Sequence, residues 1–393
     1  MEARTMSDHE QILTKLLNKI VTELALVTPR VKIQPISSGG ANFTSQLFQA
    51  TISHGDNELK LFAKVAAIGE KFRQELAGFQ IFETENNFYT KLMKIYEDLQ
   101  EKHNVPQDKR FVAPKCYGCS SKLYEEVLVL EDLSAQGFTV YDRMKSVDWD
   151  YASKAVEEIA KFHALSVAFE NENKEEFNKY LESLTYSLDI ENIPNLTDNV
   201  NKGVRFVKEE NRNRVEAFVA SFGKLNYNDM LKPIKLNVLA HCDNRVSNQM
   251  YRVNEDGRVE LKIVDYQGIW RGSPACDLLY FIFSGTDKKF RDQYYEQLLD
   301  HYYKELSLAM KRLALNPDEI YSREDFDFEY KTKLPYGLAL ALMMLPLVTA
   351  DEENVPKMDK DLSMLSFSVN NTSDILRERI NEVVDDFIRW GLV

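Results

Sequence analysis

The hydrophobic pattern changes its period along the chain, and this change limits the folds that the chain can adopt. From Val31 to Val65 three β-prone runs, VKIQPI, SQLFQATI and LKLFAKVA, are separated by the turn-rich segments SSGGANF and SHGDN, which is typical of an antiparallel meander. After Gly137 apolar residues recur at helical spacing, over 148–169, 202–222, 277–306, 326–348 and 372–390. The pattern predicts an α+β fold with a small antiparallel β-rich lobe and a larger, mainly helical lobe.

Shorter elements set the expected boundaries. Helical spacing also occurs over 12–24 and 79–93, two more strands are expected at 113–119 and 124–130, and a β-rich island, Leu236–Gln267, interrupts the helical part. A chain of 393 residues is longer than one average domain. We therefore predict an N-terminal lobe at 1–130, a connector at 131–137 and a C-terminal lobe at 138–393.

The charge balance excludes several classes of partner. The chain has 62 acidic and 49 basic residues, a formal net charge of −13, whereas binding to nucleic acid or anionic lipid depends on clustered Lys and Arg. The longest apolar run, Leu334–Ala350, is shorter than a membrane span and contains two prolines, so a buried helix is expected. The N-terminus has no apolar core of signal-peptide length. We expect a cytoplasmic monomer with no nucleic-acid or membrane partner.

The four cysteines give no framework for disulfides or zinc. Cys116 and Cys119 form a lone CxxC without the second ligand pair of a zinc site. We expect both to be structural thiols.

The segment from Val238 to Gln267 carries the clearest chemical pattern. His241, Asp243 and Asn248 have the H-x-D-x-x-x-x-N spacing of a kinase catalytic loop. Phosphoryl transfer to a hydroxyl needs a carboxylate near the acceptor oxygen and an oxygen ligand for a metal ion. Asp243 and Asn248 are therefore the candidates for a catalytic base and a metal ligand.

A hairpin prediction brings a second carboxylate to the same place. If Asp256 and Gly257 form a two-residue turn, residue 248 lies opposite Asp265. A four-residue loop would put residue 263 opposite residue 248, with Asp265 about 7 Å along the strand. In both cases Asn248 and Asp265 emerge at the same end of the hairpin and could hold Mg²⁺.

The meander supplies candidates for phosphate binding. Ser37–Gln46, SSGGANFTSQ, reads either as a loop whose backbone N–H groups cover phosphates or as a plain hairpin turn. Lys64 lies in an otherwise apolar strand and needs a partner if it is buried. Glu85 and Glu75 are the candidate partners, whereas Glu83 fits a solvated face.

The connector, Asp277 and His163 are further candidates for a role at the site. Backbone groups of Glu131 and Leu133, in the connector, could bind the edge of an adenine. Asp277 could cap the helix that follows it or brace the catalytic loop. His163, on an apolar helix face, is more simply a core histidine with its hydrogen bonds satisfied than a functional group.

These motifs together resemble the ecdysteroid kinase-like family, relatives of choline and aminoglycoside kinases with a protein-kinase-like fold. The resemblance covers nearly the whole chain and depends on these segments: GANFTS, Lys64, FETENNFY, VLEDL, KFHAL, HCDNRVSNQM, VDYQ, SPACDLLYF and YGLALALMMLP. DYQ in place of DFG, and the lack of an A-P-E signature, favour small-molecule kinases over protein kinases.

The resemblance implies an ATP- and Mg²⁺-dependent kinase that phosphorylates a hydroxyl of a small hydrophobic molecule, such as an ecdysteroid or another steroid or xenobiotic alcohol. It assigns Asp243 as the catalytic base, Asn248 and Asp265 as metal ligands, and Lys64 with Glu85 as the pair that positions phosphate. The nucleotide would also contact Gly39, Gly40, Asn42, Ser45, Glu131 and Leu133. The alternatives are a choline- or aminoglycoside-type kinase with another acceptor and a kinase-like protein that sequesters a ligand without turnover.

Two departures from the family pattern lie in the catalytic loop. Cys242 stands where Gly is common between His and Asp, and Asn244-Arg245 replaces a more apolar pair. The predicted acceptor pocket draws on 138–149 and 336–348.

Overall fold

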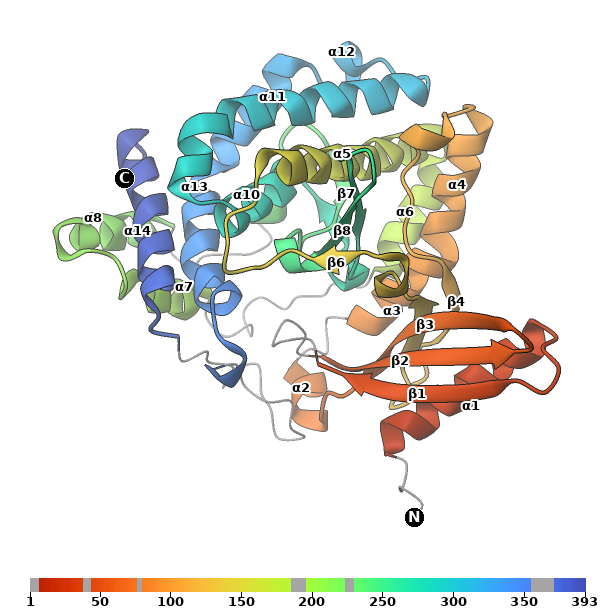
Figure 1. Ribbon diagram of the computed structural model, residues 1–393. Coiled ribbons are helices and arrows are strands. Elements are labelled where there is room, and N and C mark those ends of the chain that lie inside the picture. Colours follow the sequence, from red (N-terminus) through yellow and green to blue (C-terminus); the bar gives the residue numbers. More distant parts are fainter. Residues whose placement is uncertain (1–6, 38–43, 76–79, 185–195, 223–229, 355–370) are drawn as a thin grey trace.

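A β-rich lobe and a helical lobe meet along the middle of the molecule (Figure 1). This computed structural model describes residues 7–37, 44–75, 80–184, 196–222, 230–354 and 371–393. The β-rich lobe contains a five-stranded antiparallel sheet in the order β1-β2-β3-β5-β4. Its strands are β1 (Arg30–Ile36), β2 (Ser45–His54), β3 (Asn57–Ala66), β4 (Cys116–Ser120) and β5 (Val127–Glu131).

Helix α1 (Asp8–Glu23) covers one face of this sheet. Ser7 caps the helix in a reciprocal pair with Glu10, and the apolar residues at 13, 16, 17 and 20 pack on alternate residues of β2 and β3, including Ala63 and Val65. Because successive strand side chains point to opposite faces, Lys64 lies on the face away from α1. The chain then forms α2 (Glu70–Glu75), α3 (Ile81–Asn87), a π-helical turn (Phe88–Leu92) and α4 (Met93–Lys102).

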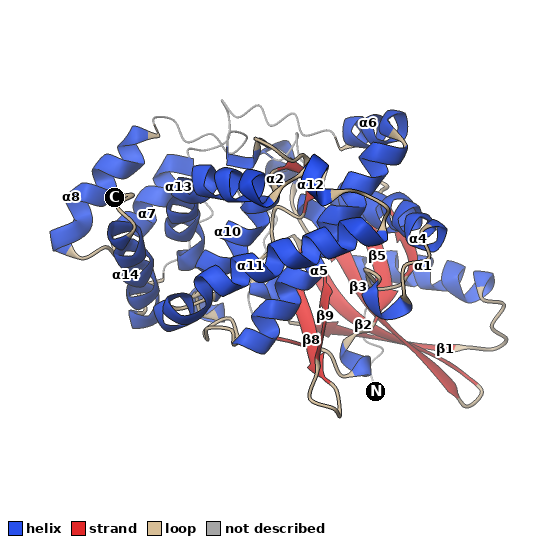
Figure 2. Cartoon of the chain, turned by 90° about the horizontal axis from the view of Figure 1, so that it is seen from above, coloured by secondary structure: helices blue, strands red, loops and turns tan. Residues whose placement is uncertain are grey.

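The helical lobe is built around α5 (Trp149–Glu172), which lies beside α11 (Lys288–Arg312) (Figure 2). Both are mostly buried along the faces where they meet. The other helices are α6 (Lys174–Ser183), α7 (Leu196–Val204), α8 (Glu209–Ser221), α10 (Pro274–Gly285), α12 (Pro317–Ile320), α13 (Arg323–Val348) and α14 (Asp374–Arg389).

Two small sheets carry the β-rich island into this lobe. Strand β6 (Thr139–Val140) pairs with β8 (Gln249–Val253), which forms a hairpin with β9 (Val259–Ile263). Strand β7 (Val238–Ala240) pairs with β10 (Trp270–Gly272). These short strands place the loop after β7 and the end of β9 side by side at the boundary with the β-rich lobe.

The α+β, two-lobed fold class is confirmed. The helical patterns over 202–222 and 277–306 each correspond to two helices, α7 with α8 and α10 with α11. In the second case Thr286 and Asp287 separate α10 from α11, and the Asp287 side chain accepts a hydrogen bond from the Phe290 N–H to start the new helix. Strands β6 and β10 are too short to give a strand pattern.

The apolar run Leu334–Ala350 lies largely in α13, where 337–342 are buried, as expected. Across the described ranges, none of the helices combines the length and apolar character needed to cross a bilayer. Cys116 and Cys119 are free thiols on β4.

Helix α5 also carries a compact group of charges, the α5 cluster, formed by Lys154, Glu157, Glu158 and Lys161. Lys161 Nζ lies 2.8 Å from Glu158 Oε1 and 3.0 Å from Glu157 Oε1. Lys154 Nζ lies 2.9 Å and 3.0 Å from the same two carboxylates. Each lysine–glutamate pair is three or four positions apart, so one helix brings the four residues together.

Candidate active site

The β8–β9 hairpin has a different register from either prediction. Gln249 pairs with Ile263 and Val253 with Val259, and the Val264 N–H donates to the Asn248 carbonyl at 2.9 Å. Residue 248 therefore lies opposite 264, so both predicted registers were wrong by one position. The cause is a three-residue loop, 255–257, in which Gly257 has φ +80°, the conformation of a turn closed by a bulge.

Asp265 follows directly after this hairpin pair. Its φ is +68°, so the chain bends sharply there, and a non-glycine residue adopts this left-handed conformation only at some cost. The bend turns Asp265 toward the β-rich lobe, while Asn248 ends the loop on the neighbouring strand. The expectation that the two side chains leave the hairpin at one end agrees with this register.

Lys64 joins the two lobes through two carboxylates. Its Nζ lies 2.8 Å from Glu85 Oε2 on α3 and 2.7 Å from Asp265 Oδ1. The three residues, here called the Lys64 cluster, have side chains that are 11%, 4% and 18% exposed in the order Lys64, Glu85 and Asp265. Glu85 is thus the candidate partner that contacts Lys64, and the side chain of the other candidate, Glu75, lies outside the described residues. Glu83 is exposed, as expected.

Burial and ion pairing act in opposite directions on these groups. Burial alone would lower the pKa of Lys64, but Asp265 and Glu85 raise it well above its ordinary value. Burial opposes ionisation of Asp265 as well, yet Lys64 holds the pKa of that carboxyl below its ordinary value. Lys64 is therefore a fixed ammonium at neutral pH and Asp265 a fixed carboxylate.

Asp243 is held by three side chains around its carboxylate. Asn248 Nδ2 donates to Asp243 Oδ2 at 2.8 Å and to its carbonyl at 2.9 Å. Arg245 Nε lies 3.2 Å from Asp243 Oδ1. The Tyr280 hydroxyl is the third partner. Burial raises the pKa of Tyr280 most, and the charge of Asp243 and the hydrogen bond to Asp243 raise it further. The carboxylate thus keeps a single orientation at the edge of the helical lobe.

The backbone before Asp243 is braced from beneath by Asp277. Its Oδ2 accepts the His241 N–H at 2.7 Å and its Oδ1 accepts the Cys242 N–H at 2.8 Å. His163 Nε2 bonds the same carboxylate at 2.9 Å. The capping interpretation of Asp277 was wrong, because Ser273 caps α10; the bracing interpretation fits the geometry.

His163 is a core histidine, as expected. Both ring nitrogens have partners, since Nδ1 lies 2.8 Å from the Tyr302 hydroxyl, and the side chains of His163 and Asp277 are both 0% exposed. Cys242, held by the same brace, has φ +62°, the left-handed region that favours glycine.

The predicted phosphate loop is described only at its end. Gly39, Gly40 and Asn42 lie outside the described residues. Ser45 is buried at the start of β2. Its neighbour Thr44 has Oγ1 3.5 Å from Gln267 Oε1, and Gln267 Nε2 lies 3.5 Å from Asp265 Oδ2. The end of the loop therefore reaches the Lys64 cluster through Gln267.

The connector is tied to both lobes. The Glu131 N–H donates to the Lys115 carbonyl at 2.8 Å, and Glu131 Oε1 lies 3.0 Å from Lys262 Nζ on β9. The Leu133 carbonyl accepts the N–H groups of Gln136 and Phe138, at 3.0 and 3.1 Å. The Glu131 N–H is thus already used by the protein, which leaves it unable to donate to an adenine.

The donor set fits a hard divalent cation. Asp265 supplies carboxylate oxygens, and Asn248 uses its amide nitrogen on Asp243, which leaves the amide oxygen as its remaining ligand atom. Within the described part of the chain, no three His, Cys, Asp or Glu side chains gather into a metal site. Two oxygen ligands suit Mg²⁺, which takes most other positions from water and phosphate.

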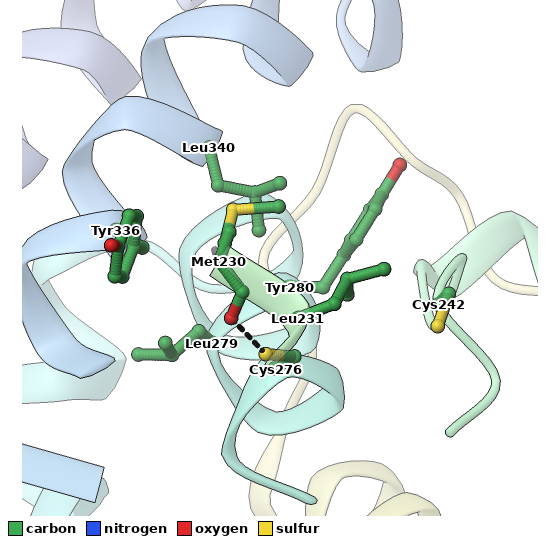
Figure 3. A pocket seen from close by; sticks show the side chains of 8 residues that line it. All are labelled: Met230, Leu231, Cys242, Cys276, Leu279, Tyr280, Tyr336 and Leu340. Atoms are coloured by element: carbon green, nitrogen blue, oxygen red, sulfur yellow. Dashed lines mark hydrogen bonds between the residues drawn. The ribbon is translucent and has the colours of Figure 1, made fainter. Parts of the chain in front are cut away.

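A small pocket opens beside the loop that carries Asp243 (Figure 3). Its volume is about 10 Å³, room for about one water molecule. Apolar and sulfur-containing side chains from the segment before β7, the loop, α10 and α13 line it: Met230, Leu231, Cys242, Cys276, Leu279, Tyr280, Tyr336 and Leu340. Tyr336 and Leu340 fall in the predicted 336–348 range, whereas none comes from 138–149.

Several neighbours of the site give no sequence signal of their own. Tyr266 stacks on Phe88 with ring centroids 3.5 Å apart, which packs the residue after Asp265 against the π-helical turn. Arg245, Gln267 and Tyr280 contact site carboxylates and lie in the segments HCDNRVSNQM, VDYQ and SPACDLLYF. None of the three was given a role from the sequence, and only Arg245 was singled out, as part of a departure from the family pattern.

Known proteins match this chain at two levels. The sequence model described as the ecdysteroid kinase-like family matches residues 39–315, a region that contains Lys64, Asp243 and Asp265. A search of curated proteins finds no match.

Solved structures give weaker likenesses. A GDP complex of a mutant aminoglycoside 2′-phosphotransferase IIIa is 13% identical with a TM-score of 0.45, covering 84% of this chain and 95% of that one. A glucosamine kinase in complex with glucosamine, ADP and inorganic phosphate is 12% identical with a TM-score of 0.36, covering 96% and 87%.

Proposed function

The chain belongs to the ecdysteroid kinase-like family and is a small-molecule phosphotransferase with an alcohol group as acceptor; from this premise we propose its reaction. It transfers the γ-phosphate of ATP, with Mg²⁺, to a hydroxyl of a hydrophobic acceptor such as an ecdysteroid or another steroid or xenobiotic alcohol.

The Lys64 cluster is the observation that carries this proposal. An ammonium group held at 2.8 and 2.7 Å by carboxylates from a helix and from a hairpin end is costly to bury. That cost is understandable where the charge must meet phosphate at a fixed point. In the proposal Lys64 contacts the nucleotide phosphates, and Glu85 keeps it in place when a metal ion draws on Asp265.

Asp243 acts on the acceptor. As the acceptor oxygen attacks the γ-phosphorus, Asp243 takes its proton, the bond from the γ-phosphorus to the bridging oxygen breaks, and ADP leaves with that electron pair. Mg²⁺, held by Asn248 and Asp265, neutralises phosphate charge when bound. The contacts from Asn248 and Arg245 hold Asp243 in one orientation for this step.

The nucleotide lies between the lobes in this proposal. Residues 1–130 form the nucleotide-binding lobe, 131–137 the connector and 138–393 the lobe that binds the acceptor. The phosphate contacts fall to Gly39, Gly40, Asn42 and Ser45. At the connector, Leu133 is a better backbone contact for adenine than Glu131, because the Glu131 N–H donates to Lys115.

The small pocket beside Asp243 marks the acceptor side. Its lining is apolar and reaches the Tyr280 side chain, whose hydroxyl bonds Asp243. At about 10 Å³ it has room for about one water molecule, so Tyr336 and Leu340 on α13 have to move for an acceptor to enter.

The test is turnover with purified protein, ATP, Mg²⁺ and a panel of steroid and plant-derived alcohols. ADP release that matches phosphorylated product supports the proposal, and it should collapse in Asp243→Asn and Asp265→Asn. Unchanged rates in both variants would refute the site assignment. Nucleotide binding with no turnover on any acceptor would instead favour ligand sequestration, and turnover on choline or an aminoglycoside would favour that acceptor class.

A further inference from the structure

Arg245 has so far been given only the task of holding Asp243 in one orientation. Its side chain is 8% exposed, and its Nε lies 3.2 Å from Asp243 Oδ1 and 3.3 Å from Oδ2. The backbone explains this contact, because the Arg245 N–H donates to the Asp243 carbonyl at 2.9 Å and the tight turn folds one side chain over the other.

Arg245 lies beside both the acceptor side and the metal side of the proposed site. Its Nε contacts the Asp243 carboxylate, and Asn248, a proposed metal ligand, donates from Nδ2 to the same carboxylate at 2.8 Å. The guanidinium therefore lies near the space between Asp243 and the proposed metal site.

A charge count shows why a second cation matters there. Asp243, Asp265 and Glu85 bring three carboxyl groups to the site, and Lys64 is already shared between Asp265 and Glu85. Arg245 is the other cation in contact with this group of carboxylates within the described residues. In a site this buried, fixed charges are weakly screened, and a phosphoryl group in transit adds further negative charge.

Holding Asp243 still does not by itself account for Arg245. Asn248 Nδ2 already bonds Asp243 at 2.8 Å, and the Tyr280 hydroxyl lies against the same carboxylate. A planar guanidinium is well suited to phosphate oxygens as well as to carboxylate.

We propose that Arg245 is a catalytic residue that donates hydrogen bonds to the γ-phosphoryl oxygens during transfer. As the bond between the γ-phosphorus and the bridging oxygen breaks and the acceptor oxygen bonds to phosphorus, Arg245 offsets the charge of the phosphoryl oxygens. The acceptor proton goes to Asp243 and the electron pair leaves with ADP. This inference rests on the proposed kinase function.

The test uses MgADP with aluminium fluoride, which imitates a phosphoryl group in transit and needs no knowledge of the acceptor. Titration calorimetry measures the affinity for MgADP with and without aluminium fluoride. We expect aluminium fluoride to tighten MgADP binding in the wild-type protein. In Arg245→Gln we expect unchanged MgADP affinity, little tightening, and a kcat lower by roughly 100-fold, with no matching rise in KM for ATP.

Two further variants control for misfolding and for the general loss of an arginine. Arg245→Lys keeps the charge and should recover part of the tightening even if Arg245→Gln folds poorly. Arg252→Gln removes an arginine that pairs with Glu260 on the same hairpin and should behave like the wild type; circular dichroism and thermal melting check the fold of each.

The outcomes separate the two proposals. Equal tightening in the wild type and in Arg245→Gln, or none in either, overturns the role of Arg245 and leaves the kinase function standing if MgADP binds. Failure of the wild type to bind MgADP overturns the kinase function, and the role of Arg245 with it.

Discussion

Two buried charge clusters with similar chemistry are assembled in opposite ways. The α5 cluster pairs two lysines with two glutamates from one helix, all within seven positions. The Lys64 cluster joins residues 21 and 201 positions apart, from a strand, a helix and a hairpin end. Burial alone would lower the pKa of Lys154 and Lys64, but nearby carboxylates raise the pKa of both lysines well above their ordinary value.

This difference distinguishes a cluster that supports the fold, the α5 cluster, from one that suits a function, the Lys64 cluster. The α5 cluster needs only helical spacing, so it can form wherever α5 forms. The Lys64 cluster exists only when the two lobes meet in one arrangement, and its carboxylate Asp265 lies in a strained backbone. Exposure does not distinguish the clusters, because Lys154 and Glu157 are 21% and 19% exposed and Asp265 is 18% exposed. Charges that require two lobes and a strained backbone to come together suit a ligand, and the predictions below test that distinction.

The largest effect is expected at Asp265, the proposed metal ligand. Asp265→Asn should lower kcat by roughly 1,000-fold or more, because Asp265 would lose its charge both as the proposed metal ligand and as a partner of Lys64. Steady-state kinetics with a saturating acceptor measures it. Asp256→Asn is the matched control, since that aspartate pairs only with Arg258 at the exposed tip of the same hairpin. Equal losses in both variants would contradict the assignment.

Lys64→Met should damage both activity and stability. We expect kcat/KM for ATP to fall roughly 100-fold and the free energy of unfolding to fall by about 3 kcal/mol, because Glu85 is left buried and unpaired. Urea denaturation measures the second quantity. Adding Glu85→Gln should restore stability but not activity, and Lys60→Met, at an exposed position on the same strand, should change neither.

Asp277→Asn should weaken the loop that carries Asp243. Loss of the carboxylate removes charged acceptors from the His241 and Cys242 N–H groups and from His163. We expect the free energy of unfolding to fall by about 2 kcal/mol, with kcat reduced and nucleotide affinity unchanged. A large loss of nucleotide affinity would show that Asp277 acts more directly than the structure indicates.

The smallest effect is expected in the α5 cluster. Lys161→Met should lower the free energy of unfolding by about 1 kcal/mol, because Lys154 still pairs with both glutamates, and should leave kcat unchanged. A loss of activity as large as that of Lys64→Met would remove the distinction between the clusters.

The α5 cluster also predicts a dependence of stability on pH. Burial alone would raise the pKa of Glu157, but Lys161 and Lys154 hold that pKa at about 2, below the ordinary 4.5. Its pairing therefore stabilises the fold fully above pH 4.5 and is lost as pH falls toward 2. Stability curves from pH 6 to 2.5 should be flatter in Glu157→Gln than in the wild type; identical slopes would contradict the shift.

The two clusters also show how far sequence reasoning reached. Glu85 was a candidate partner for Lys64, because a lysine in an apolar strand requires a carboxylate and α3 offered one. The direct contact of Lys64 with Asp265 was not predicted, since it depends on how the lobes pack. The fold class followed from hydrophobic period, which is a local property.

The hairpin register and the contacts around Asp243 could not be predicted from the sequence, and the structure shows why. The hairpin register was wrong by one because Gly257 adopts a positive φ in a three-residue loop, which competes with the two-residue turn that the same letters favour. Arg245 and Tyr280 contact Asp243 from two separate elements, so the spacing of residues along the chain does not predict that they meet there.

The π-helical turn at Phe88–Leu92 gives the site an unusual tolerance of chain length. Such a turn holds about one residue more than an α turn over the same rotation, so removing one residue would restore a continuous α-helix and leave the helices on either side facing as they do now. Deletion of the exposed Thr90 should then keep Glu85 directed at Lys64. In evolutionary terms, this turn is a place where the gene could gain or lose a single codon without disturbing the Lys64 cluster.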